Sequence, residues 1–153
     1  MSEPATSNPV SLTSADIFRD LSLELLRQGK SIRFHAPGRS MYPSIKENEV
    51  ITVEPISPSA VQTGDILLYQ SGQHLVAHRV VRIDLGGDGA RLFILRGDTW
   101  GTYDQPVKAK QIFGKVVGVE RKGQPINPYS RKAQIRLIIH TIASWIKSRV
   151  TRS

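Results

Sequence analysis

Residues 64–83, GDILLYQSGQHLVAHRVVRI, contain the pattern that decides the fold. Two runs rich in Leu, Val, Ile and Tyr lie on either side of Ser71-Gly72-Gln73. Apolar runs joined by a short Gly-containing segment are typical of a β-hairpin. We therefore expect strands at residues 65–70 and 74–83, with a tight turn between them.

The same texture of short apolar runs, separated by Gly, Pro and Asp, extends from residue 32 to residue 120. It predicts six strands without intervening helices, at residues 32–35, 50–54, 65–70, 74–83, 91–96 and 111–120. A second turn is expected at LGGDGA, residues 85–90. Six short strands in succession favour a mainly β fold, built as a small rolled β-sheet or barrel.

A helix is predicted before the β region. Ser14 is a suitable N-cap and Gly29 is placed to end the helix. Apolar residues recur between them at helical spacing, and we expect this face to pack on the body: Ile17, Phe18, Leu21, Leu25 and Leu26. Residues 1–13 are polar and contain prolines, and they are predicted to be disordered.

The positive charge of the chain belongs to its C-terminal part. The net charge is +8, yet residues 1–120 hold 13 basic and 13 acidic residues, whereas residues 121–153 hold eight basic residues and no acidic one. This basic tail, residues 121–153, also has apolar residues at helical spacing, which predicts an amphipathic helix: Ile135, Ile138, Ile139, Ile142, Trp145 and Ile146. Such a helix suits an anionic membrane surface or a cover for the barrel, and both interpretations stay open.

Several protein classes are excluded or disfavoured by composition. The sequence has no cysteine, which excludes disulfides and thiolate zinc sites. The sequence shows neither a signal peptide nor a run of about 20 apolar residues, so a cytoplasmic or peripheral membrane location is expected. The body lacks interleaved basic and aromatic residues, so nucleic acid is not expected as a partner.

The histidines are the candidate bases for a serine nucleophile: His35, His74, His78 and His140. A serine hydroxyl is a poor nucleophile until a base takes its proton, so a catalytic role for Ser40 requires one of them. His74 and His78 share one face of a predicted strand, which makes a two-histidine metal site conceivable. Zinc normally takes three or four protein ligands, and no third ligand is indicated, so no metal is predicted.

Five segments resemble, in order, the boxes of the type I signal peptidase family, which shares its β-fold with LexA-type repressors. They are GRSMYPSI (38–45), GDILLYQ (64–70), AHRVV (77–81), GDTWGTYD (97–104) and GKVVGV (114–119). The likeness is closest to the archaeal and endoplasmic-reticulum branch, in which the base is a histidine in a His-Arg-Val context. The resemblance covers residues 38–120 and implies a catalytic domain over residues 14–120.

The resemblance implies a serine endopeptidase that cleaves a leader or signal-like peptide after a small residue such as alanine. Carried over by position, it makes Ser40 the nucleophile and His78 the general base. Asp104 would orient the imidazole and balance its charge, with Asp98 in support. The partner is a peptide or precursor protein, and no metal or organic cofactor is required.

Four neighbouring positions are expected to support this site: Gly38, Met41, Pro43 and Arg79. Family members usually carry a serine or threonine two residues before the nucleophile, and its hydroxyl helps to hold the oxyanion. This chain has glycine there, so the expected oxyanion donor is the backbone N–H of Ser40. Met41 and Pro43 would hold the serine backbone, and Arg79, on the strand face opposite the base, would pair with a carboxylate.

The missing membrane anchor is a second departure from the family. The basic helix within residues 131–153 is a candidate substitute, because apolar burial and attraction to anionic lipids add. This helix would place the protein on the cytoplasmic leaflet. The expected substrate is then either a cytoplasmic leader peptide or a membrane protein that the enzyme reaches from inside the membrane.

Other functions stay open on the same residues. A catalytically silent module could use the groove to bind a peptide as an extra strand. A LexA-like repressor is disfavoured, because residues 1–30 offer one helix and the chain has no Ala-Gly cleavage site. Taken singly, Ser40 could cap a turn, His78 could be a structural strand histidine, and Asp98 and Asp104 could form turns.

Overall fold

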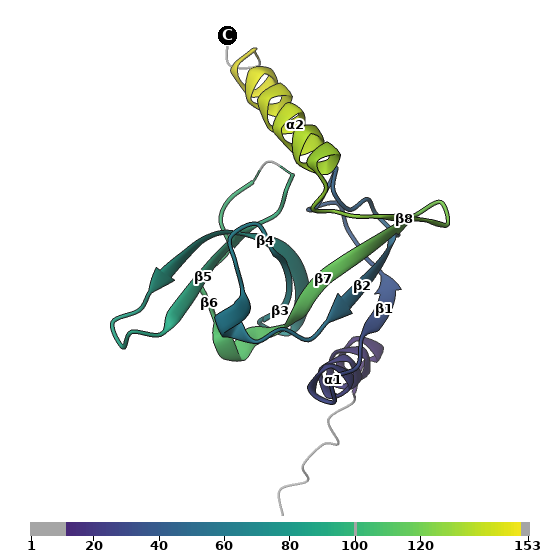
Figure 1. Ribbon diagram of the computed structural model, residues 1–153, viewed down its shortest axis with the longest axis vertical. Coiled ribbons are helices and arrows are strands. Elements are labelled where there is room, and N and C mark those ends of the chain that lie inside the picture. Colours follow the sequence, from purple (N-terminus) through teal and green to yellow (C-terminus); the bar gives the residue numbers. More distant parts are fainter. Residues whose placement is uncertain (1–11, 100, 151–153) are drawn as a thin grey trace, which may run out of the picture.

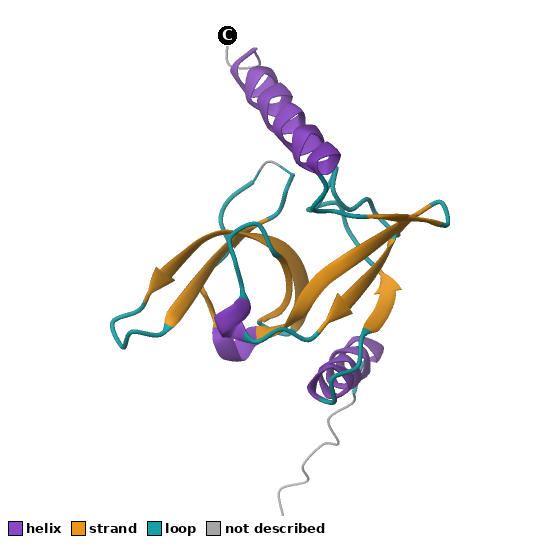
Figure 2. Cartoon of the chain, in the orientation of Figure 1, coloured by secondary structure: helices purple, strands orange, loops and turns teal. Residues whose placement is uncertain are grey.

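The computed structural model describes residues 12–99 and 101–150, without the side chains of residues 131–137. The predicted mainly β class is confirmed, because eight strands form one antiparallel sheet with a helix at each end of the described chain (Figures 1 and 2). The sheet is open and does not close into a barrel. The disorder predicted for residues 1–13 falls almost wholly outside the described residues.

The elements follow one another along the chain as α1 (Ser14–Arg27), β1 (Ile32–His35), β2 (Val50–Glu54), η1 (Pro58–Ala60), β3 (Ile66–Ser71), β4 (His74–Leu85), β5 (Arg91–Arg96), β6 (Val107–Lys108), η2 (Ala109–Gln111), β7 (Ile112–Arg121), β8 (Gln124–Ile126) and α2 (Arg131–Val150). The strand order in the sheet is β1-β2-β7-β3-β4-β5-β6, and β8 pairs with β7. The first and last of these strands leave the sheet with open edges.

The six predicted strands are all present, and two short ones were missed. β1, β2 and β5 have the predicted bounds, and β3, β4 and β7 differ by one or two residues. β6 has only two residues, which is too short for an apolar pattern. β8 follows a turn at Lys122 and Gly123, both with positive φ, and it lies in the stretch expected to belong to the tail.

The sheet body therefore continues past residue 120. Pro128 is fully buried. The Tyr129 hydroxyl donates to the carbonyl of Val116 at 2.6 Å and accepts from the backbone N–H of Ile66 at 2.9 Å. These contacts fix residues 121–129 on the body, so only the segment from α2 onward extends as a tail.

Two groups of buried apolar side chains make the core. One joins the C-terminal half of α1 to β1, β2, β3 and β7 and contains Leu26, Ile32, Met41, Ile45, Ile51, Val53, Ile66, Leu68, Phe113, Val116 and Val119. The other lies between β3, β4 and β5 and contains Val61, Leu67, Tyr69, Val80, Phe93, Leu95 and Val107. Alternation along β3 sends successive side chains into different groups, because neighbouring residues of a strand point to opposite faces.

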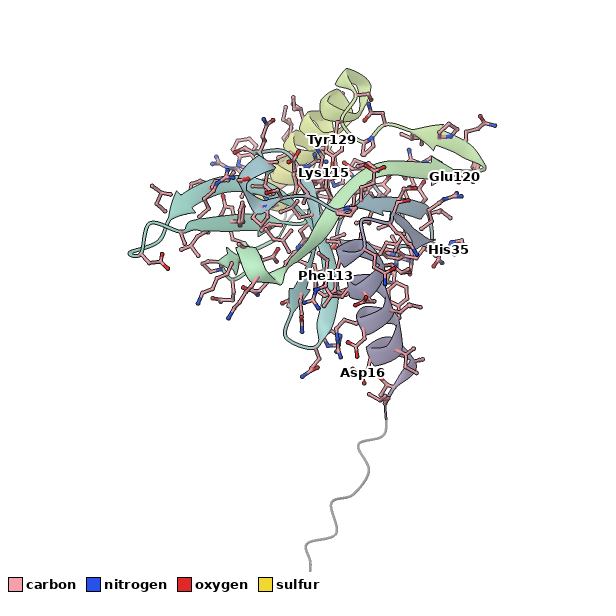
Figure 3. All side chains as sticks on the ribbon, turned by 60° about the horizontal axis from the view of Figure 1, so that its bottom comes forward. Asp16, His35, Phe113, Lys115, Glu120 and Tyr129 are labelled. Carbon is pink, nitrogen blue, oxygen red and sulfur yellow. The ribbon has the colours of Figure 1, made fainter. Side chains whose placement is uncertain are left out.

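The N-cap of helix α1 lies one residue earlier than expected. The helix packs with only part of its apolar face. The N-cap is Thr13, which forms a capping box with Asp16, and Gly29 at φ 78° follows the helix end as predicted. Leu26 is buried, whereas Ile17 and Leu21 are each 56% exposed. The expected packing of this face is wrong for Ile17 and Leu21, whereas Leu25 and Leu26 pack on the core as predicted. Figure 3 shows α1, with Asp16, next to the part of the sheet that carries His35 and Phe113.

Helix α2 is present as predicted and extends away from the sheet, at the end opposite α1 (Figure 1). Five side chains of its predicted apolar face are exposed by 45% to 61%, namely Ile138, Ile139, Ile142, Trp145 and Ile146, and the side chain of Ile135 lies outside the described part. The helix therefore does not cover the sheet. Among the described residues, no helix combines the length and hydropathy needed to cross a bilayer.

Candidate active site

Ser40 lies in a tight turn that follows β1. The Arg39 carbonyl accepts from the Tyr42 N–H at 3.2 Å and from the Thr99 hydroxyl at 2.6 Å. Met41 is 5% exposed and anchors the turn in the core, and the Tyr42–Pro43 peptide bond is cis. The Ser40 side chain is exposed, and its backbone is fixed by the hydrogen bonds of Arg39 on one side and the buried Met41 on the other.

Gly97 lets the end of β5 approach the serine backbone. A Cβ at this position would lie 2.4 Å from the carbonyl oxygen of Ser40, which leaves no room for any other residue. The next residue but one, Thr99, donates its backbone N–H to the same carbonyl at 2.9 Å. The GDT segment therefore fixes the position of the candidate nucleophile by direct backbone contact.

The structure brings three of the predicted site residues together. His78 Nε2 lies 3.0 Å from Ser40 Oγ, and His78 Nδ1 lies 2.6 Å from Asp104 Oδ2. Because a carboxylate only accepts hydrogen bonds, Nδ1 carries the proton and Nε2 is left to accept from the serine hydroxyl. This is the connectivity that transfer of the serine proton to the imidazole requires.

The register of the hairpin explains where His78 points. In the β3–β4 pair His78 lies opposite Leu67, and Ser71 lies opposite His74 across the turn at Gly72. Asp104 reaches the imidazole from the loop after β5, where its backbone N–H donates to the Leu95 carbonyl at 2.9 Å. Three segments distant in sequence therefore supply the three side chains.

Asp98 does not join this group and instead pairs with Arg79. Arg79 Nε and Nη2 donate to the two carboxylate oxygens at 2.8 and 2.7 Å. The Asp98 side chain is 3% exposed and that of Arg79 is 13% exposed, so the ion pair is buried. Burial acts to lower the pKa of Arg79, but the hydrogen bond and the charge of Asp98 outweigh it and raise the pKa.

This ion pair holds the scaffold beneath the site. Arg79 also donates to the Gly64 carbonyl at 2.9 Å and to the Ser44 hydroxyl at 3.3 Å. It thereby links the turn after Ser40, the start of the β3 segment and the GDT loop. The pairing of Arg79 with a carboxylate, expected from strand alternation, is confirmed. The support that Asp98 gives is structural and does not involve contact with the imidazole.

Tyr69 is a site residue that the sequence analysis missed. Its hydroxyl donates to Asp104 Oδ2 at 2.7 Å, so this oxygen accepts from both Tyr69 and His78. Burial, followed by the hydrogen bond and charge of Asp104, raises the pKa of Tyr69 and keeps its proton in place. The hairpin register could have identified Tyr69. Because Leu67 lies opposite His78, Tyr69 is the diagonal neighbour of His78 on the same face of the sheet.

Any hydrolysis that depends on Ser40 and His78 is expected to fall about tenfold in kcat/KM when Tyr69 is replaced by Phe, because a hydrogen bond to a charged group contributes roughly 1.5–3 kcal/mol. The aromatic ring stays, so the core keeps its volume. Tyr129→Phe is the matched control, since it removes a buried hydroxyl that pairs with backbone groups. Hydrolysis and thermal unfolding of both variants are the measurements. Equal kcat/KM for Tyr69→Phe and wild type would show that the hydroxyl does not position Asp104.

Gly38 has a left-handed backbone, which gives a physical reason for glycine at this position. Its φ is 82°, a conformation that a serine or threonine adopts only at a cost of roughly 1–2 kcal/mol. Among the described residues, the backbone N–H of Ser40 has no hydrogen-bond partner. It is therefore available as the oxyanion donor assigned to it by the resemblance.

The other histidines lie apart from this arrangement. His35 Nδ1 lies 2.8 Å from the Asn48 carbonyl, and the ring of His140 on α2 packs edge-on against Tyr42 at 5.4 Å. His74 is exposed. In the described part of the chain, no three potential metal ligands come together.

A groove begins at Ser40 and runs between two strand edges. It encloses about 550 Å³ and is lined by residues 34–38 on one side and residues 73–77 on the other. Among the described strand pairings, β1 pairs only with β2, and His74–His78 of β4 pair only with β3. Both walls therefore present unpaired strand edges next to the serine.

Comparisons of the chain with models of protein families, with curated proteins and with solved structures find no match. The family assignment stays a prediction that depends on the five segments.

Proposed function

We propose that this chain is a serine endopeptidase of the signal peptidase I type, with Ser40 as nucleophile and His78 as general base. The observation that carries the proposal is the continuous hydrogen-bonded series from Ser40 Oγ through the His78 imidazole to Asp104. A structural serine or a structural histidine requires no such series. Its presence beside an open groove is what a peptide-cleaving site requires.

The reaction proceeds through an acyl-enzyme. Ser40 Oγ attacks the carbonyl carbon of the substrate while its proton passes to His78 Nε2. His78 then gives this proton to the amine of the leaving peptide, and the acyl group stays on Ser40 as an ester. A water molecule, deprotonated by His78, releases the acyl group and restores the serine. Asp104 stabilises the imidazolium in both halves of the cycle.

The substrate is an extended peptide that adds a strand between β1 and β4. Two unpaired edges face one groove, so one peptide could exchange backbone hydrogen bonds with either wall. The opening at Ser40 leaves the scissile bond next to the hydroxyl. A leader or signal-like segment with a small residue before the bond is the proposed substrate.

Cleavage of a mixed peptide library, read by mass spectrometry, tests this function. Wild type should cleave peptides with Ala-x-Ala segments, and Ser40→Ala should not. A catalytically silent module with the same groove is the second candidate, favoured by the same free edges. Binding of library peptides by both proteins with no cleavage by either would establish that second function and reject the first.

The exposed apolar side chains of α2 and the basic residues of the tail support a peripheral contact with anionic lipids. Deleting residues 131–153 removes six basic residues, each contributing about 1 kcal/mol near an anionic surface. Co-sedimentation with phosphatidylserine vesicles should fall to background, while cleavage of a soluble peptide is retained. A deletion of residues 2–11 is the control. Unchanged vesicle binding without residues 131–153 would contradict the membrane contact.

A further inference from the structure

Helix α1 forms the end wall of the groove. Ala15, Phe18 and Arg19 of α1 line it together with Phe34 of β1 and Leu75 of β4. The apolar spacing of this helix predicts packing on the body, but its N-terminal half borders the space that begins at Ser40. The helix is therefore placed to contact a peptide that lies in the groove.

Phe18 and Phe34 make an aromatic pair at this end. Their ring centroids are 5.1 Å apart in an edge-to-face arrangement. Phe18 is 42% exposed, although it packs on another ring. An apolar side chain inserted beside the pair would bury surface that now faces solvent. Among the described residues that line the groove, none is acidic.

The wall is fixed to the hairpin that carries His78. Arg19 Nη1 donates to the backbone carbonyl of Gln73 at 3.3 Å and to its side-chain oxygen at 3.2 Å. Ion pairs with Asp16 and Asp20 hold the guanidinium, whose side chain is 17% exposed. The N-terminal half of α1 is thereby joined to the tip of the β3–β4 hairpin, and the position of Phe18 is defined.

We propose that Phe18 and Phe34 form a subsite for a bulky apolar side chain of the peptide substrate. Phe34 precedes Gly38 by four residues, and a chain of that length spans at most about 13 Å. A peptide paired with β1 would place the matching side chain about four residues from the scissile bond. The inference rests on the proposed function, since it assigns specificity to the same groove.

Paired peptides that differ at one position test the subsite. Starting from a cleaved library sequence, each position three to five residues from the scissile bond is changed between Phe and Ala. At one of these positions wild type should prefer Phe by at least tenfold in kcat/KM, as a hydrophobic pocket does. In Phe18→Ala this ratio should fall to about twofold. A ratio near one at every position in wild type would overturn the proposal.

Ile17→Ala is the matched control, because Ile17 is on the same helix, is 56% exposed and does not line the groove. It should keep the wild-type ratio. Circular dichroism and thermal unfolding establish that α1 is intact in both variants. An equal loss of discrimination in Ile17→Ala and Phe18→Ala would show a general effect on the helix and contradict a specific subsite.

Binding to the Ser40→Ala variant separates this inference from the proposed function. Fluorescence titration with the Phe and Ala peptides measures the affinity of the groove for each peptide in the absence of turnover. Tighter binding of the Phe peptide, lost in the Ser40→Ala, Phe18→Ala double variant, supports the subsite even if wild type cleaves no peptide. Cleavage by wild type without any Phe18-dependent preference would reject the subsite and leave the peptidase function standing.

Discussion

Ser40→Ala and His78→Ala are each expected to lower peptide turnover by roughly four orders of magnitude or more. Ser40 Oγ supplies the nucleophile and His78 Nε2, 3.0 Å away, takes its proton. Neither step has a substitute among the described side chains around the site. Residues that act as one unit also lose activity together, so the double variant should be no less active than either single variant.

The measurement is kcat/KM for one cleaved peptide, with the unfolding temperature as a control on the fold. Ser40 is exposed, so its replacement should leave the unfolding temperature unchanged. His140→Ala is a matched control for the histidine, because the His140 ring packs against Tyr42 from α2 and does not line the groove. Turnover retained within tenfold in Ser40→Ala would exclude this serine as the nucleophile.

Asp104→Asn is expected to cost nearly as much, about 10³- to 10⁴-fold in kcat/KM. Asp104 Oδ2 accepts from His78 Nδ1 at 2.6 Å and so determines which nitrogen carries the proton. An amide can donate to Nδ1, which would move the imidazole proton to Nε2 and remove the acceptor for Ser40. The side chain is 23% exposed, so the effect on folding should be small.

Asp98→Asn distinguishes the role of Asp98 from that of Asp104. This change leaves Arg79 buried without its counter-charge, and removing one partner of a buried ion pair costs roughly 3–5 kcal/mol of stability. Its turnover per folded molecule should stay well above that of Asp104→Asn. Chemical denaturation together with cleavage assays tests both statements. If Asp98→Asn lost more turnover per folded molecule than Asp104→Asn, the assignment of the orienting carboxylate would be reversed.

The strands and the hairpin were accessible from sequence because their signals are local. Apolar runs on both sides of Gly72 are sufficient to place β3 and β4, and the pairing of His78 with Leu67 follows from the short turn. β8 was not accessible in this way, because its three residues include a proline and form a strand only by pairing with β7. Its structure depends on tertiary contacts.

The candidate site was accessible only in part. Strand alternation was sufficient to place Arg79 and His78 on opposite faces, and Arg79 does pair with a carboxylate. Which aspartate reaches the imidazole depends on the path of the loop after β5, and local patterns do not encode that path. Tyr69 and the contact between Gly97 and Ser40 are also tertiary features, since each joins segments distant in sequence.

The packing of α1 shows the same limit. Helical spacing identified an apolar face, but not which part of that face the sheet would cover. Leu26 is buried, whereas Phe18 borders the groove and Ile17 is exposed. The exposure of the N-terminal half of α1 is explained by the groove between β1 and β4, which this half borders.

In the proposed mechanism, Ser40 becomes acylated by the substrate. A short peptide ester ending in alanine, mixed with the protein and quenched in acid, tests it by intact-protein and fragment mass spectrometry. We expect an acyl adduct on Ser40 in wild type, with none in Ser40→Ala or His78→Ala. Ester hydrolysis by wild type with an adduct on another residue, or equal labelling of Ser40 in His78→Ala, would contradict it.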